Sequence, residues 1–128
     1  MRTRILVWTI VIVFGVGAAA AEDKPISPEE AAKRVNQRCV VAMTVLSTGK
    51  SKTGSVVFLN SQEDFRDENN FTILLDSRAL QRLRDNGIEE PGEHYKGKTI
   101  HVTGTVTLHM GRPQIVISDP SNIVMVAK

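Results

Sequence analysis

The chain is poor in the residue types that staple small domains or bind metals. Its 128 residues include a single cysteine, Cys39, and three histidines. One cysteine excludes an internal disulfide, so the fold must depend on packing alone. One cysteine and three scattered histidines also give no zinc-ligand spacing, and we expect no metal site. Because Cys39 starts an apolar run, we expect a buried structural thiol, with a reactive thiol as the alternative.

Aromatic residues are also scarce and make up 5% of the chain. Beyond residue 21 the aromatic side chains are Phe58, Phe65, Phe71 and Tyr95. Proteins that bind single-stranded nucleic acid stack bases on such rings. This scarcity argues against a dedicated single-strand binder, although one well-placed ring would still offer a platform.

No pattern typical of an active site is present. The sequence has no Ser-His-Asp or Cys-His order, and no histidine has an acidic partner at a characteristic spacing. The pairs Glu63-Asp64 and Asp67-Glu68 could ligate a cation, as a secreted nuclease would require. They lack the spacing and central glycine of an EF-hand, so a solvated acidic loop is the preferred interpretation. We therefore predict no enzyme and no cofactor.

The N-terminus has the pattern of an export signal. Arg2 and Arg4 precede an apolar run over residues 5–17, and four alanines follow at 18–21. A positive start, an apolar middle and a small-residue exit are typical of a secretory signal peptide. The run is short for a membrane span, which needs about 20 apolar residues. We predict cleavage after residue 20 or 21, with an uncleaved anchor helix as the alternative.

Removing this segment changes the charge balance. The whole chain carries 16 Lys+Arg and 14 Asp+Glu, and two of the arginines leave with the signal peptide. The remaining 14 basic groups match the 14 acidic groups, so the mature protein lacks the positive field of a strong non-specific nucleic-acid binder. We expect a signal peptide at residues 1–21 and one domain at 22–128, exported to the periplasm or secreted, with no stable membrane association after cleavage.

Periodicity predicts mostly β-structure with two helices. Ser27, Pro28 and Glu30 favour the start of a short lead-in helix. Leu80 and Leu83 lie at helical spacing within a second helix over 77–85. The β-forming runs lie at residues 40–46, 55–60, 70–76, 99–108 and 113–118, with 123–126 after an interruption, and polar stretches at 47–54, 61–69 and 89–92 are expected to be loops.

The order strand, strand, strand, helix, strand, strand matches a five-stranded Greek-key barrel of the OB type, an all-β class with short helices. Gly104 within the fourth strand marks a bulge, a bend or the close approach of another segment. In that strand Leu108 is expected to share the inward face. The expected interior positions are Val41, Met43, Val57, Leu59, Phe71, Ile73, Leu75, Ile100, Val102, Val106, Ile115 and Ile117.

Several segments resemble a family of small bacterial OB-fold domains found in exported proteins and described as nucleic-acid-binding. The resemblance lies in residues 54–60 (GSVVFLN), 70–75 (NFTILL), 95–104 (YKGKTIHVTG), 111–115 (GRPQI) and 119–123 (DPSNI). It implies the OB fold across nearly the whole mature chain and says little about function. One departure is the turn after the first helix, which is Asn36-Gln37 here and glycine-lysine in the family.

OB barrels usually bind ligands on the face of their second and third strands, between the loop after the first strand and the loop after the fourth. Here those loops carry Lys50 and Lys52 on one side and His109 and Arg112 on the other. Phe58 would face outward on the second strand if its two neighbours face inward. We predict these five residues as a ligand-binding set.

Two functions compete for this site. The first is a nucleic-acid or oligonucleotide-binding module, and the alternative is a module that binds a protein, an oligosaccharide or another small ligand in the cell envelope. A contact set with few basic groups predicts modest, salt-sensitive affinity for nucleic acid. The Asn-Phe-Thr triplet at 70–72 is formally a glycosylation sequon, but it falls in a predicted strand.

Overall fold

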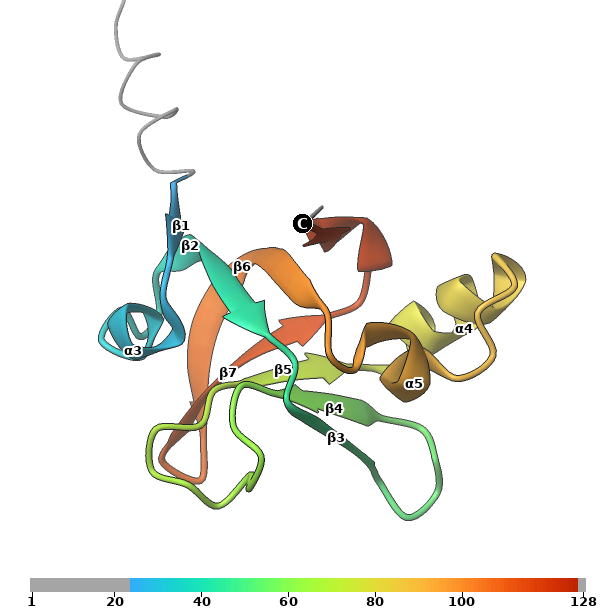
Figure 1. The fold of residues 1–128 in the computed structure, drawn as a ribbon, viewed down its shortest axis with the longest axis horizontal. Helices are drawn as coiled ribbons and strands as arrows, with labels where there is room; N and C mark the ends of the chain where they lie inside the picture. The colour runs from blue at the N-terminus through green and yellow to red at the C-terminus, as the bar shows by residue number, and fades with distance from the viewer. Residues whose placement is uncertain (1–23, 127–128) are drawn as a thin grey trace, which may run out of the picture.

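The computed structural model describes residues 24–126 and shows a mostly β architecture with short helices (Figure 1). The predicted signal peptide lies outside the described residues. Within residues 24–126, no helix is long and apolar enough to cross a membrane. The strands are β1 (Pro25–Ile26), β2 (Arg38–Thr44), β3 (Ser47–Lys50), β4 (Val57–Asn60), β5 (Thr72–Leu75), β6 (Thr99–His109), β7 (Arg112–Ile117) and β8 (Ile123–Met125). The helices are α3 (Pro28–Ala31), α4 (Ser77–Asp85), α5 (Pro91–Tyr95) and the 3-10 turn η2 (Pro120–Asn122).

The strands form one sheet with an open path. Its order is β1-β2-β6-β7-β5-β4-β3, and β8 pairs with β6 off this path. The pairs β1–β2 and β5–β7 are parallel, and the other pairs are antiparallel. The mostly β class with short helices is confirmed. The prediction of a closed barrel of five strands is wrong, because the described sheet has eight strands and an open path.

The difference arises mainly in residues 40–54, which were predicted as one strand and a loop and contain two strands in the structure. β2 pairs with β6, whereas β3, which falls in the predicted loop 47–54, pairs with β4. Between them the Val45 N–H donates to the Lys98 carbonyl at 2.9 Å, and the Leu46 N–H donates to the Asn60 carbonyl at 2.9 Å. The chain therefore changes neighbour within two residues, and Figure 1 shows it running from beside β6 to beside β4.

The core lies between the two parts of this curved sheet, and every interior position expected from the sequence is buried. Leu108 is the exception to the predicted alternation, since its side chain is 52% exposed. The reason is that β6 extends beyond the core, where Leu108 pairs with Pro113 in the β6–β7 hairpin. The hydrophobic pattern fixes which side of a strand is apolar, but not how far the core reaches along it.

Gly104 permits the close approach that its place within a strand suggests. A Cβ atom at this position would lie 2.5 Å from Cγ2 of Ile115 and 3.8 Å from Cδ1 of Ile117. Gly104 pairs with Cys39 of β2, and two residues further on Val106 pairs with Ile115 of β7. β6 thus passes from one part of the sheet to the other at the residue where a side chain would collide with β7.

The first helix begins at the cap that the sequence indicates, whereas the N-cap of α4, Asp76, was not predicted. The Ser27 hydroxyl accepts from the Glu30 N–H at 3.1 Å, although α3 spans only four residues, which is shorter than the predicted helix. Asn36 adopts φ 69°, a left-handed conformation that asparagine tolerates, at a position where the resemblance leads one to expect glycine. α5 was predicted as a loop and lies beside the β3–β4 hairpin, with Tyr95 buried at its end.

We expect Gly104→Ala to lower the free energy of unfolding by about 1–3 kcal/mol, because the added methyl group must displace Ile115 in a packed core. Gly49→Ala is the matched control, since a Cβ there lies 3.8 Å from Phe58, an ordinary contact. Chemical denaturation of both variants measures the difference. Equal stability of the two variants would contradict the proposed collision.

Asp76 provides a pH-dependent contribution to stability. Burial alone would raise the pKa of Asp76, but hydrogen bonds from the Ser118 hydroxyl and the Ala79 and Arg78 N–H groups lower this pKa overall. Since a lowered carboxyl pKa stabilises the fold when the group is ionised, its contribution is lost as the pH falls through the folded-state pKa. We expect Asp76→Ala to cost about 0.5–2 kcal/mol at neutral pH, as for other N-caps. In urea denaturation this difference should shrink below about pH 4, and a pH-independent difference would contradict the assignment.

Candidate functional site

An apolar row crosses the outer face of β3, β4, β5 and β7. The strand registers place Phe58 beside Gly49 on one side and Leu74 on the other, and Leu74 beside Val116. Val57 and Leu59 are buried and Phe58 is only half-buried, so the predicted outward direction of Phe58 is confirmed. We call the surface formed by Gly49, Phe58, Leu74 and Val116 the outer face.

Gly49 keeps the Phe58 ring accessible from the β3 side. It has no side chain to cover the ring, and a Cβ there would lie in contact with Phe58 Cδ2. Leu74 is half-buried and Val116 is exposed, so the row continues as an apolar strip across the strands. The strip offers one aromatic ring for stacking, with aliphatic contacts beside it.

The two predicted lysines lie in different surroundings. Lys50 follows Gly49 at the end of β3, and its Nζ lies 3.2 Å from Oε1 of Glu90, just before α5. Both side chains are more than half exposed, so this ion pair contributes little and can exchange for another partner. Lys52 lies exposed in the β3–β4 hairpin loop, and no ion pair involving it occurs within residues 24–126.

Arg112 is committed to holding a loop. Its guanidinium donates to three backbone carbonyls, those of Phe65 at 3.1 Å, Arg66 at 2.8 Å and Asp67 at 3.3 Å. His109 pairs with Arg112 across the β6–β7 turn and is exposed. The structure therefore brings His109 and Arg112 together, away from the lysines in the β3–β4 hairpin, as the two separate turns in Figure 1 show.

The loop that Arg112 holds, residues 61–71, is acidic. Glu63, Asp64, Asp67 and Glu68 are all exposed in it, and we call it the acidic loop. Arg66 lies 3.1 Å from Asp64, and hydrogen bonds from Arg66 lower the pKa of Asp64 below its usual value. Within the described part of the chain no three His, Cys, Asp or Glu side chains are placed to hold a metal ion. With four carboxylates and one arginine, the acidic loop beside Arg112 carries a net negative charge.

Buried amides fix both ends of the acidic loop. Asn60 Oδ1 accepts from the Thr72 hydroxyl at 3.0 Å and from Asn70 Nδ2 at 3.4 Å. Asn70 Oδ1 accepts from the Gln62 N–H at 3.1 Å, and the Ser61 hydroxyl accepts from the Phe71 N–H at 2.9 Å. Asn70 is 4% exposed, so the sequon at 70–72 is shielded in the folded protein. In the sequence, only the amide-rich composition of this stretch points to such a network.

Two buried groups outside the outer face have shifted pKa values. Burial raises the pKa of the Cys39 thiol more than the Arg34 charge lowers it, so the thiol stays protonated and the prediction that it is buried is confirmed. Burial also raises the pKa of Tyr95. Tyr95 borders a shallow hollow between α4 and η2, which is also lined by Arg82, Asn86 and Asp119. Arg82 lies 3.5 Å from Asp119 across it.

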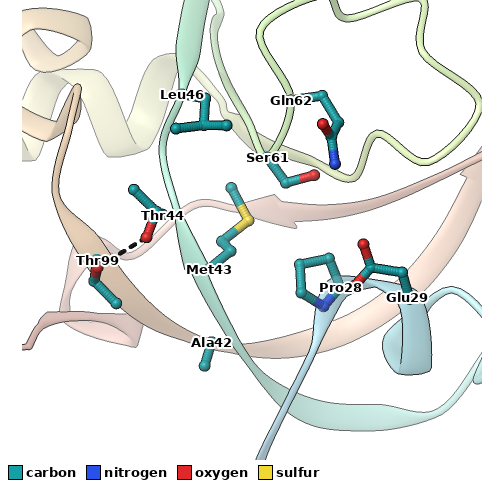
Figure 2. Close-up of a pocket in the computed structure, with 9 residues that line it drawn as sticks. All are labelled: Pro28, Glu29, Ala42, Met43, Thr44, Leu46, Ser61, Gln62 and Thr99. Carbon is teal, nitrogen blue, oxygen red and sulfur yellow. Dashed lines mark hydrogen bonds between the residues drawn. The ribbon is translucent and has the colours of Figure 1, made fainter.

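A second hollow lies beside β2, and we call it the edge groove (Figure 2). Its volume is about 270 Å³. Figure 2 shows the Met43 side chain extending from β2 toward Ser61, with Leu46 on one side and Pro28 on the other. It is lined by Pro28, Glu29, Ala42, Met43, Thr44, Leu46, Ser61, Gln62 and Thr99.

Comparison with solved structures shows the OB fold at low sequence identity. The chain is similar to an aspartyl-tRNA synthetase from Entamoeba histolytica, with a TM-score of 0.52 and 13% identity over 94% of this chain and 24% of that one. It is similar to an asparaginyl-tRNA synthetase from Pyrococcus horikoshii, with a TM-score of 0.50 and 14% identity over 79% of this chain and 22% of that one. This chain thus corresponds to about a quarter of either synthetase.

The structure is also similar to an OBody bound to hen egg-white lysozyme, with a TM-score of 0.50 and 18% identity over 76% of this chain and 86% of that one. No protein-family model matches the sequence, and no curated protein matches it. The identities are low enough that these likenesses establish the fold alone.

We expect Arg112→Ala to loosen the acidic loop, because it removes three hydrogen bonds to backbone carbonyls. Hydrogen exchange of the amides in residues 62–69 should accelerate about tenfold or more, given about 1.5–3 kcal/mol for a hydrogen bond to a charged group. His109→Ala is the control at the neighbouring position. Unchanged exchange in Arg112→Ala would show that the buried amides alone hold the loop.

Proposed function

We propose that the chain is a non-catalytic module that binds single-stranded nucleic acid weakly across the outer face. The observation that carries this proposal is the direction of Phe58, which presents its ring beside Gly49 on the face where OB folds bind ligands. Stacking on an aromatic ring is tolerant of sequence, because every base has a π-face. The similarity to parts of two tRNA synthetases is in keeping with this ligand class.

The two ends of the predicted site differ in charge, and this difference determines how the ligand would lie across it. Lys52, and Lys50 after exchange from Glu90, can reach phosphates near the β3–β4 hairpin. The acidic loop that Arg112 holds carries four exposed carboxylates, which would repel phosphates at the other end. We therefore place the backbone of the ligand near the lysines and its base on Phe58, with one or two phosphate contacts.

A protein ligand is the second candidate, favoured by the exposed apolar side chains near the β6–β7 turn. Met110 is 89% exposed and Phe65 of the adjoining acidic loop is 62% exposed, in addition to Leu108. Exposed apolar groups of this size at a loop tip are typical of contact surfaces between proteins. The similar OBody is bound to lysozyme, a protein.

We further propose that the module acts outside the cytoplasm. The proposal rests on the charged, apolar and small-residue pattern of residues 1–21 and on the single cysteine. Its burial leaves the described domain without an exposed thiol that oxidation could cross-link.

The test is a titration of a fluorescently labelled single-stranded oligonucleotide with the protein, at low and at moderate salt. We expect Phe58→Ala to weaken binding about tenfold, because stacking contributes about 1–3 kcal/mol per base. Lys52→Glu should flatten the slope of log affinity against log salt by about one. Phe65→Ala, which removes another exposed ring away from the outer face, should leave affinity unchanged.

Two further variants separate the ligand classes. Phe58→Tyr keeps the aromatic platform and should keep the affinity, which distinguishes lost stacking from lost folding. Absence of binding at low salt, or equal losses in Phe58→Ala and Phe65→Ala, would overturn the nucleic-acid proposal and leave the protein-binding candidate.

A further inference from the structure

The edge groove exposes backbone as well as side chains. Val45 donates its N–H to Lys98 at 2.9 Å, and its carbonyl accepts from Gly97 at 2.7 Å, so both groups point toward β6. Backbone groups of successive residues in a strand point to opposite edges. The N–H and carbonyl of Thr44 therefore point away from β6. The Thr44 and Thr99 hydroxyls lie 2.9 Å apart, as expected for a pair without backbone hydrogen bonds between them.

Nothing in the described part of the sheet pairs with that edge at Thr44. β1 runs parallel to β2, but its register ends with Ile26 opposite Val41, where the chain turns into α3. On the far side pairing resumes at Leu46, whose N–H donates to Asn60. The open stretch from Ala42 to Val45 is about 13 Å long at the rise of an extended strand. This stretch is the part of the β2 edge that lies beyond the end of β1.

The side chains around this stretch have a consistent chemistry. Met43, Leu46 and Pro28 form an apolar floor, and Leu46 is 41% exposed although it belongs to a strand-forming run. Glu29 forms one wall, and Figure 2 shows its carboxylate turned toward Pro28 and the groove. The acidic loop continues from the opposite wall with Glu63 and Asp64. No lysine or arginine lines the groove.

We propose that the edge groove binds an extended, basic segment of a partner polypeptide. The segment pairs with the Thr44 N–H and carbonyl as a short added strand on the edge of β2 that β1 leaves open. One of its apolar side chains covers Met43 and Leu46, and a lysine or arginine faces Glu29. The negative walls exclude nucleic acid from the groove, so this site is separate from the outer face and does not depend on Phe58.

The probe is a short, terminally blocked peptide of alternating valine and lysine, titrated into the full protein. The matched peptide in which glutamate replaces lysine should bind at least about tenfold more weakly, because it meets Glu29, Glu63 and Asp64. A third peptide carries N-methyl groups along both edges and cannot pair as a strand through either edge. It should lose binding to the unaltered protein, so this result does not depend on the folding of any variant.

Two protein variants locate the site. Glu29→Gln should reduce the preference for the lysine peptide over the glutamate peptide. The control is Glu30→Gln, since Glu30 lies next along α3, pairs with Arg34 at 3.1 Å and does not line the groove. Thr44→Pro, which removes an N–H that no described strand uses, should abolish binding. Phe58→Ala should bind the peptide normally, which separates this site from the proposed nucleic-acid site.

The proposal is overturned if the N-methylated peptide binds as well as its parent, or if the glutamate peptide binds equally. Amide chemical shifts give the position directly. Changes confined to residues 42–46, 61–62 and Glu29 support the proposal, and changes centred on the outer face or on Met110 overturn it. Concentration-dependent dimerisation that Thr44→Pro abolishes, with no peptide bound, would assign the groove to a second copy of this chain instead.

Discussion

At Val45 and Leu46 the chain changes its hydrogen-bonding partner, and the rest of the structure depends on this change. The backbone of Val45 bonds toward β6 and that of Leu46 toward β4, with Val45 fully buried between them. One continuous segment therefore supplies a strand to each of the two parts of the curved sheet that enclose the core. The same step brings Gly49 beside Phe58 and leaves Thr44 without a neighbour on its outer edge.

The two binding surfaces that we propose follow from that geometry and differ in charge. The outer face is apolar, with lysines at one end and the acidic loop at the other. The edge groove has one carboxylate, that of Glu29, and no cation in its lining, and the acidic loop continues from its opposite wall. Arg112 holds the acidic loop at the other end, because both of its terminal nitrogens donate to carbonyls of that loop.

Much of the core could be predicted, because successive side chains of a strand point to opposite faces and the core lies on one of them. Val57, Leu59 and Phe58 show this directly, since two buried neighbours force the residue between them to the other face. Gly104 was identifiable because a glycine within a strand has few structural reasons to be there. The exposure of Leu108 could not be predicted. It depends on how far the core extends along β6 before the β6–β7 turn, and segments far away in the sequence determine that.

The partners of the predicted binding residues could not be predicted from the local sequence. Lys50 and Arg112 were chosen as basic side chains in loops, yet one pairs with Glu90 and the other with a loop more than 40 residues away in the sequence. The strand β3 and the helix α5 were both missed, because each is short and polar and is held by contacts with the other and with β4.

The sequence by itself determined the mostly β class, the interior positions, the Ser27 cap and the outward direction of Phe58, because each follows from local periodicity or backbone chemistry. Only the tertiary structure decided that the sheet is an open path of eight strands, which cations are free to bind, and where an edge of β2 is exposed. These properties depend on which segments that are distant in the sequence come into contact, because that contact determines the hydrogen-bonding partners of each strand and the charges beside each side chain.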